Sequence, residues 1–306
     1  MNIVSFSGGK DSTAMLLMML EKKVPVDRVL FVDTTKEFPQ MYQHVARVQE
    51  FCPVEIETVK LDFDYWFGEH VTKSGELGYG FTTIKFRWCS GLKGEALRVT
   101  AGGRPYHMRR SGQKSIKHVA GKNIYIGYSA DETRRCKKYG NERYPLIEWG
   151  VSGPQALAYC YSKGLNWGGL YEKFVRVSCW CCPFKRIGEL KTLYKEFPEL
   201  WAKLVEMDKK SPVRFSSYYS VQDLVKKFTT KVYKTAEASK YLGISESTLK
   251  RLERRGVLSC VKTDGAHRVF TQGALDAYAA WVAARQEDPG KKVYGRKIFG
   301  GGLTYL

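Results

Sequence analysis

The sequence lacks any long run of apolar residues, since no stretch approaches the roughly 20 residues that a membrane-spanning helix requires. Its first residues, Met1-Asn2-Ile3, lead directly into a glycine-rich segment and not into the layout of a signal peptide. Of its 306 residues, 43% are hydrophobic and 26% are charged, which is ordinary for a soluble globular protein. We therefore expect a cytoplasmic protein without a membrane partner, with one sizeable core and one or two small appendages.

Acidic residues are scarce relative to basic ones. There are 31 Asp and Glu against 50 Lys and Arg, which gives a formal net charge of +19 at pH 7. A mild excess would fit a basic protein whose lysines simply face water, but this excess is large for the length. Because a cationic surface gains free energy by releasing counterions from phosphates, the composition favours a nucleic-acid partner without saying which one.

The residues from Gly102 to Lys122 contain no acid at all, and we interpret them as a basic loop beside the edge of the active site. The basic residues of this loop are Arg104, Arg109, Arg110, Lys114, Lys117 and Lys122.

A disulfide framework is not expected either, because the eight cysteines lie in a chain of cytoplasmic type. Four are scattered and are best interpreted as small buried hydrophobes, namely Cys52, Cys136, Cys160 and Cys260. The other four are Cys89 and the dense run Cys179-Trp180-Cys181-Cys182.

The order of the predicted elements indicates a doubly wound α/β fold with a mostly parallel sheet. Strands are predicted at Asn2–Phe6, Arg28–Asp33, Val54–Leu61 and Asn123–Gly127, and helices at Ser12–Lys22, Pro39–Phe51, Gly153–Lys163 and Glu189–Lys209. The second strand is apolar without alternation, as in a central parallel strand covered on both faces.

A phosphate-binding loop is predicted where the first strand meets the first helix. The connecting residues are Ser7-Gly8-Gly9-Lys10-Asp11-Ser12. The glycines allow backbone N–H groups to turn toward an anion, and the helix N-terminus adds partial positive charge. Lys10 and the two serine hydroxyls supply further donors.

The cysteine run suggests a metal site. Cys179 and Cys182 have the C-x-x-C spacing that lets two thiolates bind one metal, and Pro183 follows them as in iron–sulfur loops. Thiolates suit both zinc and iron–sulfur clusters, and a group of buried thiols without metal is the structural alternative.

Residues 231–288 have the layout of a winged helix-turn-helix. Thr235–Leu242 is a predicted helix with Thr235 as its N-cap, and Ser245 caps a second helix, Glu246–Arg255. A hairpin from Leu258 to Phe270 around Asp264-Gly265 and a last helix from Thr271 follow. The candidate donors to nucleic acid are Thr248, Lys250, Arg251, Arg254, Arg255, Lys262, His267 and Arg268. The alternative is a small three-helix appendage with a solvated charged helix.

Several segments resemble the PP-loop ATP pyrophosphatases, an adenine nucleotide α-hydrolase-like fold, and within them the phosphoadenylyl-sulfate reductase branch. Ser7–Ser12 matches SGGxDS. Asp33–Pro39, Arg87–Lys93, Gly127–Arg135 and Tyr144–Trp149 are similar to further motifs, in the family's order. The DNA phosphorothioation sulfurtransferases look closest, and residues 231–288 resemble the MerR or excisionase winged helix-turn-helix. We expect a PP-loop domain at 1–230, the winged domain at 231–288 and a basic Gly-rich tail at 289–306.

The resemblance implies an enzyme that binds ATP with Mg²⁺, releases pyrophosphate and leaves an adenylylated intermediate. It implies a nucleotide site of Ser7, Gly8, Gly9, Lys10, Asp11, Ser12, Asp33 and Gly127, and catalytic roles for Lys10, Asp11, Cys89, Lys93 and Arg135. It also implies a [4Fe–4S] cluster in preference to zinc, held by Cys89, Cys179 and Cys182. The fourth ligand is Cys181, or the fourth iron stays open.

The favoured function is a nucleic-acid sulfurtransferase that acts on DNA or, second, tRNA, with a sulfur donor such as a cysteine desulfurase and a possible homo-oligomeric state. The chain departs from the branch in two ways: Ser129 replaces the family arginine, and no catalytic cysteine follows Cys260. Both departures count against a sulfonucleotide reductase, the second hypothesis. The third is a DNA-binding regulator that uses the loop to sense a nucleotide.

Overall fold

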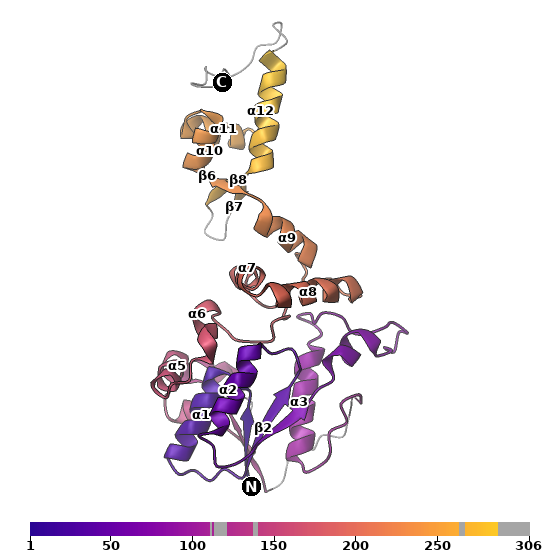
Figure 1. Cartoon of the computed structure of the whole chain (residues 1–306), viewed down its shortest axis with the longest axis vertical. Coiled ribbons are helices and arrows are strands. Elements are labelled where there is room, and N and C mark those ends of the chain that lie inside the picture. The colour runs from indigo at the N-terminus through magenta and orange to yellow at the C-terminus, as the bar shows by residue number, and fades with distance from the viewer. Residues whose placement is uncertain (111, 113–120, 137–139, 263–266, 287–306) are drawn as a thin grey trace. The chain divides into compact units, whose positions relative to one another are not determined.

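A computed structural model describes residues 1–110, 112, 121–136, 140–262 and 267–286 (Figure 1). The chain divides into two compact units, Met1–Gln222 and Asp223–Leu306. The division falls within helix α9 (Val221–Thr229). The predicted boundary at residue 230 stays a prediction. Lys114, Lys117, the hairpin tip Asp264-Gly265 and the predicted tail 289–306 lie outside the described residues.

The first unit is built on a five-stranded parallel sheet in the order β3-β2-β1-β4-β5. Its strands are β1 (Asn2–Phe6), β2 (Arg28–Asp33), β3 (Ile56–Lys60), β4 (Asn123–Ile126) and β5 (Glu142–Arg143). The register places Val4 of β1 between Val29 of β2 and Tyr125 of β4. The predicted doubly wound α/β fold is therefore confirmed.

Helices cover both faces of this sheet. Figure 1 shows α1 (Lys10–Glu21) and α2 (Pro39–Gln49) on one side of the strands and α3 (Trp88–Ala101) on the other. α5 (Gly153–Ser162) packs along α1. On the α3 face, Ile3, Leu30 and Ile124 form a buried cluster with Ala101. The burial of β2 on both faces explains its apolar run.

Shorter helices connect these elements. They are η1 (Tyr65–Glu69), η2 (Ala130–Arg135), α4 (Pro145–Glu148), η3 (Trp167–Gly169) and α6 (Leu170–Lys173). The single helix predicted at Glu189–Lys209 is wrong, because the structure has two, α7 (Ile187–Glu196) and α8 (Pro198–Lys210). Phe197 leaves the helical region with φ −131° and ψ 59°. Pro198 starts α8, because a proline ring is tolerated in the first turn of a helix but not in its interior.

The second unit is a helix-turn-helix with a three-stranded antiparallel sheet in the order β6-β8-β7. Its elements are β6 (Val232–Lys234), α10 (Thr235–Leu242), α11 (Glu246–Arg254), β7 (Val261–Lys262), β8 (Arg268–Thr271) and α12 (Gln272–Gln286). Leu242, Leu249, Leu258 and Phe270 belong to its buried core.

The caps of the two helices in this motif are only partly as predicted. Ser245 caps α11, and its Oγ accepts the Thr248 N–H at 3.2 Å. The prediction that Thr235 is the N-cap of α10 is wrong. Lys234 holds that position, and its N–H donates to Glu237 Oε2 at 2.7 Å.

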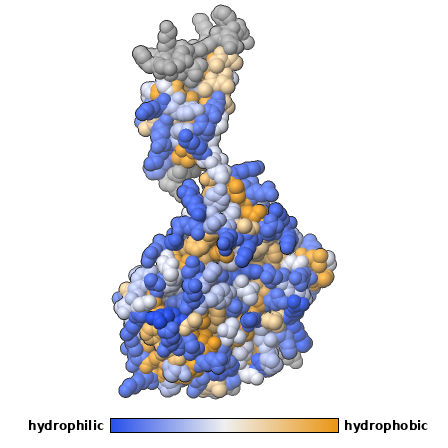
Figure 2. Space-filling model, in the orientation of Figure 1, coloured by the Kyte–Doolittle hydropathy of each residue, from blue (hydrophilic) through white to orange (hydrophobic). Residues whose placement is uncertain are grey.

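Hydrophilic residues cover most of the visible surface, with smaller apolar patches among them (Figure 2). Among the described residues, no helix is both long enough and apolar enough to span a bilayer.

Candidate nucleotide site and cysteine cluster

The phosphate loop joins the end of β1 to the start of α1. Helix α1 begins at Lys10 without a side-chain cap at Gly9. Two serines fix the loop: the Ser7 N–H donates to Ser12 Oγ at 3.2 Å, and Ser12 Oγ donates to Gly9 O at 3.0 Å. An uncapped helix N-terminus after a glycine turn offers backbone donors and partial positive charge to a phosphate.

Two glycines of the predicted nucleotide site are favoured by the structure, Gly8 by its positive φ and Gly127 by close packing against backbone. Gly8 has φ +73°, and a Cβ there would lie 2.5 Å from Met41 Sδ of α2. Gly127 follows β4, and a Cβ there would lie 2.6 Å from Ser12 Cα. The end of β4 therefore touches the first turn of α1, so a side chain at Gly127 would displace the loop.

Two aromatic residues support the loop from a distant part of the chain. Trp167 Nε1 donates to Gly8 O at 2.7 Å, and the Tyr171 hydroxyl accepts the Lys10 N–H at 2.8 Å. Sequence reasoning missed both residues. The one signal in the sequence was the run Trp167-Gly168-Gly169. In the structure all three of these residues have positive φ.

A buried histidine packs behind this support. His44 stacks on Trp167 with a centroid separation of 4.1 Å, and its Nε2 lies 3.0 Å from Thr13 Oγ1. Burial lowers the pKa of His44 to about 3, so the ring is neutral at physiological pH.

The charged residues of the loop lie beside acidic residues of η2. Lys10 Nζ is 2.6 Å from Asp11 Oδ1. Burial raises the pKa of Asp11 against the opposing effect of Lys10, and the nearby carboxylates of Glu132 and Asp131 raise it further. This negative charge close to the loop suits a bound cation such as Mg²⁺ together with phosphate.

Arg135, a predicted catalytic residue, is also on η2. Its guanidinium pairs with Glu132 and lies 4.2 Å from the centre of the Tyr128 ring. The side chain remains partly exposed, and its catalytic role stays a prediction.

Asp33 ends β2 next to the phosphate loop and is buried. Its Oδ1 accepts the Thr35 N–H at 2.7 Å and the Tyr42 hydroxyl at 2.9 Å. Burial and this hydrogen bond to Asp33 raise the pKa of Tyr42. The carboxylate therefore has a fixed orientation at the edge of the sheet.

Three segments of the chain meet around Cys179. Trp180 N–H donates to Lys36 O at 3.0 Å, which ties the cysteine run to the turn after β2. Cys179 Sγ lies 3.3 Å from Thr34 Oγ1 and 3.5 Å from Glu37 Oε1. From α3, Lys93 Nζ reaches the same Glu37 oxygen at 2.9 Å.

Glu37 and Lys93 form the main ion pair of this region. Burial alone would raise the pKa of Glu37, but Lys93 and the hydrogen bonds from Cys179 and Thr34 hold it below its ordinary value. Burial opposes charge on Lys93, but Glu37 and the nearby thiols raise its pKa. Lys93 thus lies beside the cysteines, and sequence reasoning gave Glu37 no role of its own.

The four thiols influence one another. Burial, followed by Glu37, raises the pKa of Cys179 to about 12, and burial with its cysteine neighbours raises the pKa of Cys181 well above its ordinary value. Burial and the charge of Cys182 raise the pKa of Cys89. Thiolates are therefore disfavoured here unless a cation compensates for them.

This donor set has the chemistry of a thiolate-bound metal or iron–sulfur cluster. Within the described ranges, no three His, Cys, Asp or Glu side chains already have the arrangement of ligands to one metal ion. The residues that would hold a cluster are Cys89, Cys179 and Cys182, and Cys181 is the candidate fourth ligand. The role of all four as ligands stays a prediction.

The described part of the basic loop is anchored through Arg109. Its Nε lies 2.7 Å from Asp62 Oδ2, and its guanidinium lies 5.0 Å from the centre of the Tyr65 ring. Arg109 and Arg110 are exposed. The loop thus presents cations close to the segment that follows β3.

The basic residues of the helix-turn-helix differ in how they are held. Lys250 Nζ lies 3.4 Å from Glu246 Oε2, and Arg268 Nε lies 3.1 Å from Glu253 Oε2. Arg254 Nε donates to Lys250 O at 3.3 Å. Arg251 and Arg255 are exposed on α11 and its C-cap. An anion could reach the last two most readily.

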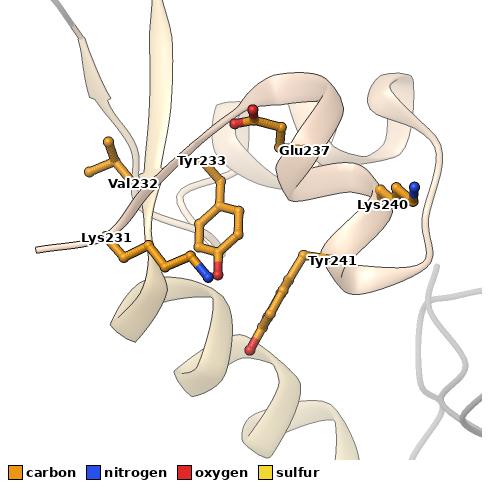
Figure 3. Close-up of a pocket in the computed structure, with 6 residues that line it drawn as sticks. All are labelled: Lys231, Val232, Tyr233, Glu237, Lys240 and Tyr241. Carbon is orange, nitrogen blue, oxygen red and sulfur yellow. The ribbon is translucent and has the colours of Figure 1, made fainter.

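A groove in the second unit lies between β6 and α10 (Figure 3). The residues that line it are Lys231, Val232, Tyr233, Glu237, Lys240 and Tyr241. The Tyr233 hydroxyl bonds to Gln272, and the Tyr241 hydroxyl donates to Asp276 Oδ1 at 2.6 Å. Both tyrosines thus fasten β6 and α10 to α12, which is a structural role.

Comparison with known proteins assigns both parts of the chain. Residues 1–185 match the phosphoadenosine phosphosulfate reductase domain, and residues 232–280 match a helix-turn-helix domain. A structural match was found to the U34-tRNA thiolase NcsA from Methanococcus maripaludis, solved with its [4Fe-4S] cluster. Its sequence is 13% identical to that of this chain. That match covers 94% of this chain and 72% of that one, with a TM-score of 0.24, and a likeness this distant adds nothing to the assignment.

Two uncharacterized proteins of Methanocaldococcus jannaschii are similar in sequence. MJ0066 is 29% identical over 209 residues, which are 66% of this chain and 40% of the relative. MJ0973 is 27% identical over 214 residues, which are 67% of this chain and 47% of the relative. The chain thus spans less than half the length of these relatives. With the reductase domain matched over residues 1–185, on a parallel sheet whose first strand ends in the SGGxDS loop, the chain belongs to the phosphoadenosine phosphosulfate reductase domain family of the PP-loop superfamily.

Proposed function

We propose that the chain is an ATP-dependent, nucleic-acid-modifying enzyme, a sulfurtransferase that acts on DNA in preference to tRNA. The observation that supports this most is the adjacency of the two sites. β1 ends in the phosphate loop, and the neighbouring β2 ends at Asp33, whose next residue, Thr34, contacts Cys179 at 3.3 Å. Nucleotide and sulfur would therefore share one edge of the sheet, the edge at which open α/β sheets bind ligands.

In the proposed reaction, an acceptor group on the nucleic acid attacks the α-phosphorus of ATP and pyrophosphate leaves. Lys10 and the N-terminus of α1 hold the phosphates, with Mg²⁺ near Asp11, and Arg135 balances developing charge from η2. Sulfur at the sulfide level then attacks the atom that carries the adenylylated oxygen, so a bond to sulfur forms and AMP leaves with that oxygen. Lys93, which favours the charged form of Cys179, stabilises negative charge on sulfur.

A [4Fe–4S] cluster bound by Cys89, Cys179 and Cys182 would supply a place to hold sulfur, with Cys181 as fourth ligand or one iron left open. Zinc is the alternative metal. A cysteine desulfurase would serve as the sulfur donor, with a thiol reductant that supplies the two electrons needed to reduce its persulfide sulfur to sulfide. The helix-turn-helix with Arg109 and Arg110 would bind the nucleic acid. A homo-oligomer remains compatible with this proposal.

The first test separates activation from sulfur transfer. The full chain, purified without oxygen, is assayed for exchange of radioactive pyrophosphate into ATP with and without DNA or tRNA, and for incorporation of ³⁵S into that nucleic acid. Lys10→Met should abolish both activities, whereas Cys182→Ser should abolish only incorporation. Release of sulfite from a sulfonucleotide would support a reductase, and operator binding without any turnover would support a regulator.

A second test concerns the metal. About four iron and four sulfide per chain are expected for one [4Fe–4S] cluster, with loss on Cys89→Ser or Cys182→Ser. One zinc per chain, or no metal, would rule out the cluster and leave adenylylation alone.

A further inference from the structure

Two segments border the cysteine cluster at the surface of the first unit. One leads into Cys89 and the other follows Cys182. The Arg87 guanidinium lies 4.4 Å from the centre of the Phe184 ring, which ties the segments together. Arg87 is exposed, and Phe184 keeps 40% of its surface exposed. An accessible cation–aromatic pair therefore lies within two residues of each of these cysteines.

A second aromatic ring is held close by on the same segment. Phe86 is 51% exposed and meets the ring of Tyr79 edge-on at 5.1 Å. Its backbone is fixed by two threonines: its N–H donates to Thr83 Oγ1 at 3.1 Å, and its carbonyl accepts from Thr82 Oγ1 at 3.0 Å. The exposed ring thus stands on an ordered turn, which reduces the entropy lost when a ligand packs on it.

The segments that carry these rings contain basic residues and no acid, and the first acid beyond them, Glu189, accepts the Arg186 N–H at 2.9 Å. No acidic residue occurs in residues 77–94 or 173–188, the two stretches that contain the segments. Exposed cations flank the rings at Lys85, Arg87 and Arg186. We name the set Lys85, Phe86, Arg87, Phe184 and Arg186 the cationic aromatic rim.

We propose that the cationic aromatic rim binds an unstacked nucleotide of the substrate strand. The base stacks on Phe184, and its phosphates meet Lys85, Arg87 and Arg186. This inference rests on the proposed function and specifies its substrate as a strand with an extruded or unpaired nucleotide. A flat apolar ring joined to an anion matches a surface that has both aromatic faces and cations.

The proposed sulfur transfer requires a site that holds an unstacked nucleotide. Enzymes that modify a nucleotide take it out of the stacked duplex, because a group inside the duplex cannot reach the reacting atoms. A stacking platform next to Cys89 and Cys182 would hold such a nucleotide beside the sulfur. The helix-turn-helix would bind flanking duplex independently.

The test uses the full chain with Arg251→Ala and Arg255→Ala, which weakens the contribution of α11 to binding. The probe is a short single-stranded oligodeoxynucleotide with one 2-aminopurine, whose fluorescence falls when it stacks, compared with the same sequence as a duplex. We expect quenching with the single strand, and Phe184→Leu should weaken its binding about 5- to 100-fold. Phe184→Tyr keeps the ring and should bind as before.

The matched control is Phe51→Leu, which removes a phenylalanine of similar exposure, 41%, remote in sequence from both segments. It should change neither quenching nor affinity. If Phe184→Leu binds and quenches like its parent, or if the duplex is bound as tightly as the single strand with no quenching, the inference is overturned. Loss of binding to phosphatidylserine vesicles with Phe184→Leu, without loss of oligonucleotide binding, would also overturn it, in favour of a membrane surface.

Failure of the proposed function can be distinguished from failure of the proposal for the cationic aromatic rim. If the parent chain bound neither DNA nor RNA and showed no pyrophosphate exchange, both proposals would be wrong. If Phe184→Leu changes neither pyrophosphate exchange, nor ³⁵S incorporation, nor oligonucleotide binding, only the proposal for the cationic aromatic rim is wrong and the proposed function stands.

Discussion

The carboxylate of Glu37 and the ammonium of Lys93 meet 2.9 Å apart beside Cys179. Glu37 has 6% of its side chain exposed and Lys93 has 36%. The pair links the turn after β2 to α3, so it holds together two of the segments that form the cysteine cluster. Removing Lys93 would leave the carboxylate of Glu37, which is almost fully buried, without its partner.

The first prediction concerns this pair. Lys93→Met should lower the free energy of unfolding by roughly 2–3 kcal/mol, less than for a fully buried pair because Lys93 is partly exposed. Glu37→Gln combined with Lys93→Met should recover most of that loss, since no charge is then left unpaired. Urea denaturation of the single and double variants measures both effects.

The control is Arg47→Met, which breaks the exposed Arg47–Glu50 pair of α2. It should cost less than about 1 kcal/mol. Equal losses for Lys93→Met and Arg47→Met would show that the Glu37–Lys93 pair has no special role in stability.

The second prediction concerns the contact between Gly127 and α1. Gly127→Ala should push the added Cβ against the backbone of Ser12, since the distance would be 2.6 Å to Cα and 2.7 Å to N. Backbone cannot move aside as a flexible side chain does, so we expect ATP affinity to fall by at least about tenfold. Isothermal titration calorimetry with a non-hydrolysable ATP analogue measures this.

Gly188→Ala is the matched control, because Gly188 lies in α7 with no heavy atom within 4 Å of an added Cβ. It should leave ATP affinity unchanged and stabilise the helix by up to about 1 kcal/mol. ATP affinity that survives Gly127→Ala would mean that the phosphates bind elsewhere.

The sequence predicted the local features of the site well. Ser7–Ser12 lies where the strand–helix junction was expected, because β1, the loop and α1 are contiguous in the chain. The family resemblance also implied a cluster held by Cys89, Cys179 and Cys182, and this stays a prediction. The phosphate loop could be predicted from the sequence because it depends on local backbone geometry and on the type of a few contiguous residues.

Contacts between distant residues were not predictable from the pattern. Tyr171 supports Lys10 across 161 residues, and no periodicity marks such a pair. The break at Phe197-Pro198 was missed because apolar spacing continues across α7 and α8, and the proline was not taken as a helix start. The cap of α10 was misplaced by one residue, since Glu237 binds the backbone of Lys234 and Thr235 is not needed as a cap.

The third prediction is a pH dependence of stability that arises from His44. Its pKa in the folded protein is about 3, below the ordinary value of about 6.5. The unfolded chain therefore binds a proton below about pH 6.5 that the folded chain does not, and stability falls as the pH drops from about 6.5 toward 3. Well below pH 6.5 the loss is about 1.4 kcal/mol per pH unit.

Urea denaturation between pH 7.5 and 4.5 tests this. The difference in stability between the parent and His44→Gln should shrink as the pH falls, because the variant has no ring to protonate. His107→Gln replaces an exposed histidine and should keep the parental slope. Parallel curves for the parent and His44→Gln would contradict the assignment.

The fourth prediction concerns the helix-turn-helix. Arg251 and Arg255 are exposed on α11 and its C-cap, whereas Lys250 and Arg268 are already paired with Glu246 and Glu253. If the first two contact phosphates, each releases about one counterion, and the slope of log K against log salt is steeper by about 0.9 per contact. Arg251→Ala with Arg255→Ala should therefore reduce that slope for duplex DNA by up to about 2.

Fluorescence anisotropy over a salt series measures this slope, with Arg47→Met as the control for loss of an exposed arginine in the first unit. A reduced affinity with an unchanged slope would mean that these arginines act on the fold of the unit and not on phosphates, and an unchanged affinity would move the DNA contact away from α11.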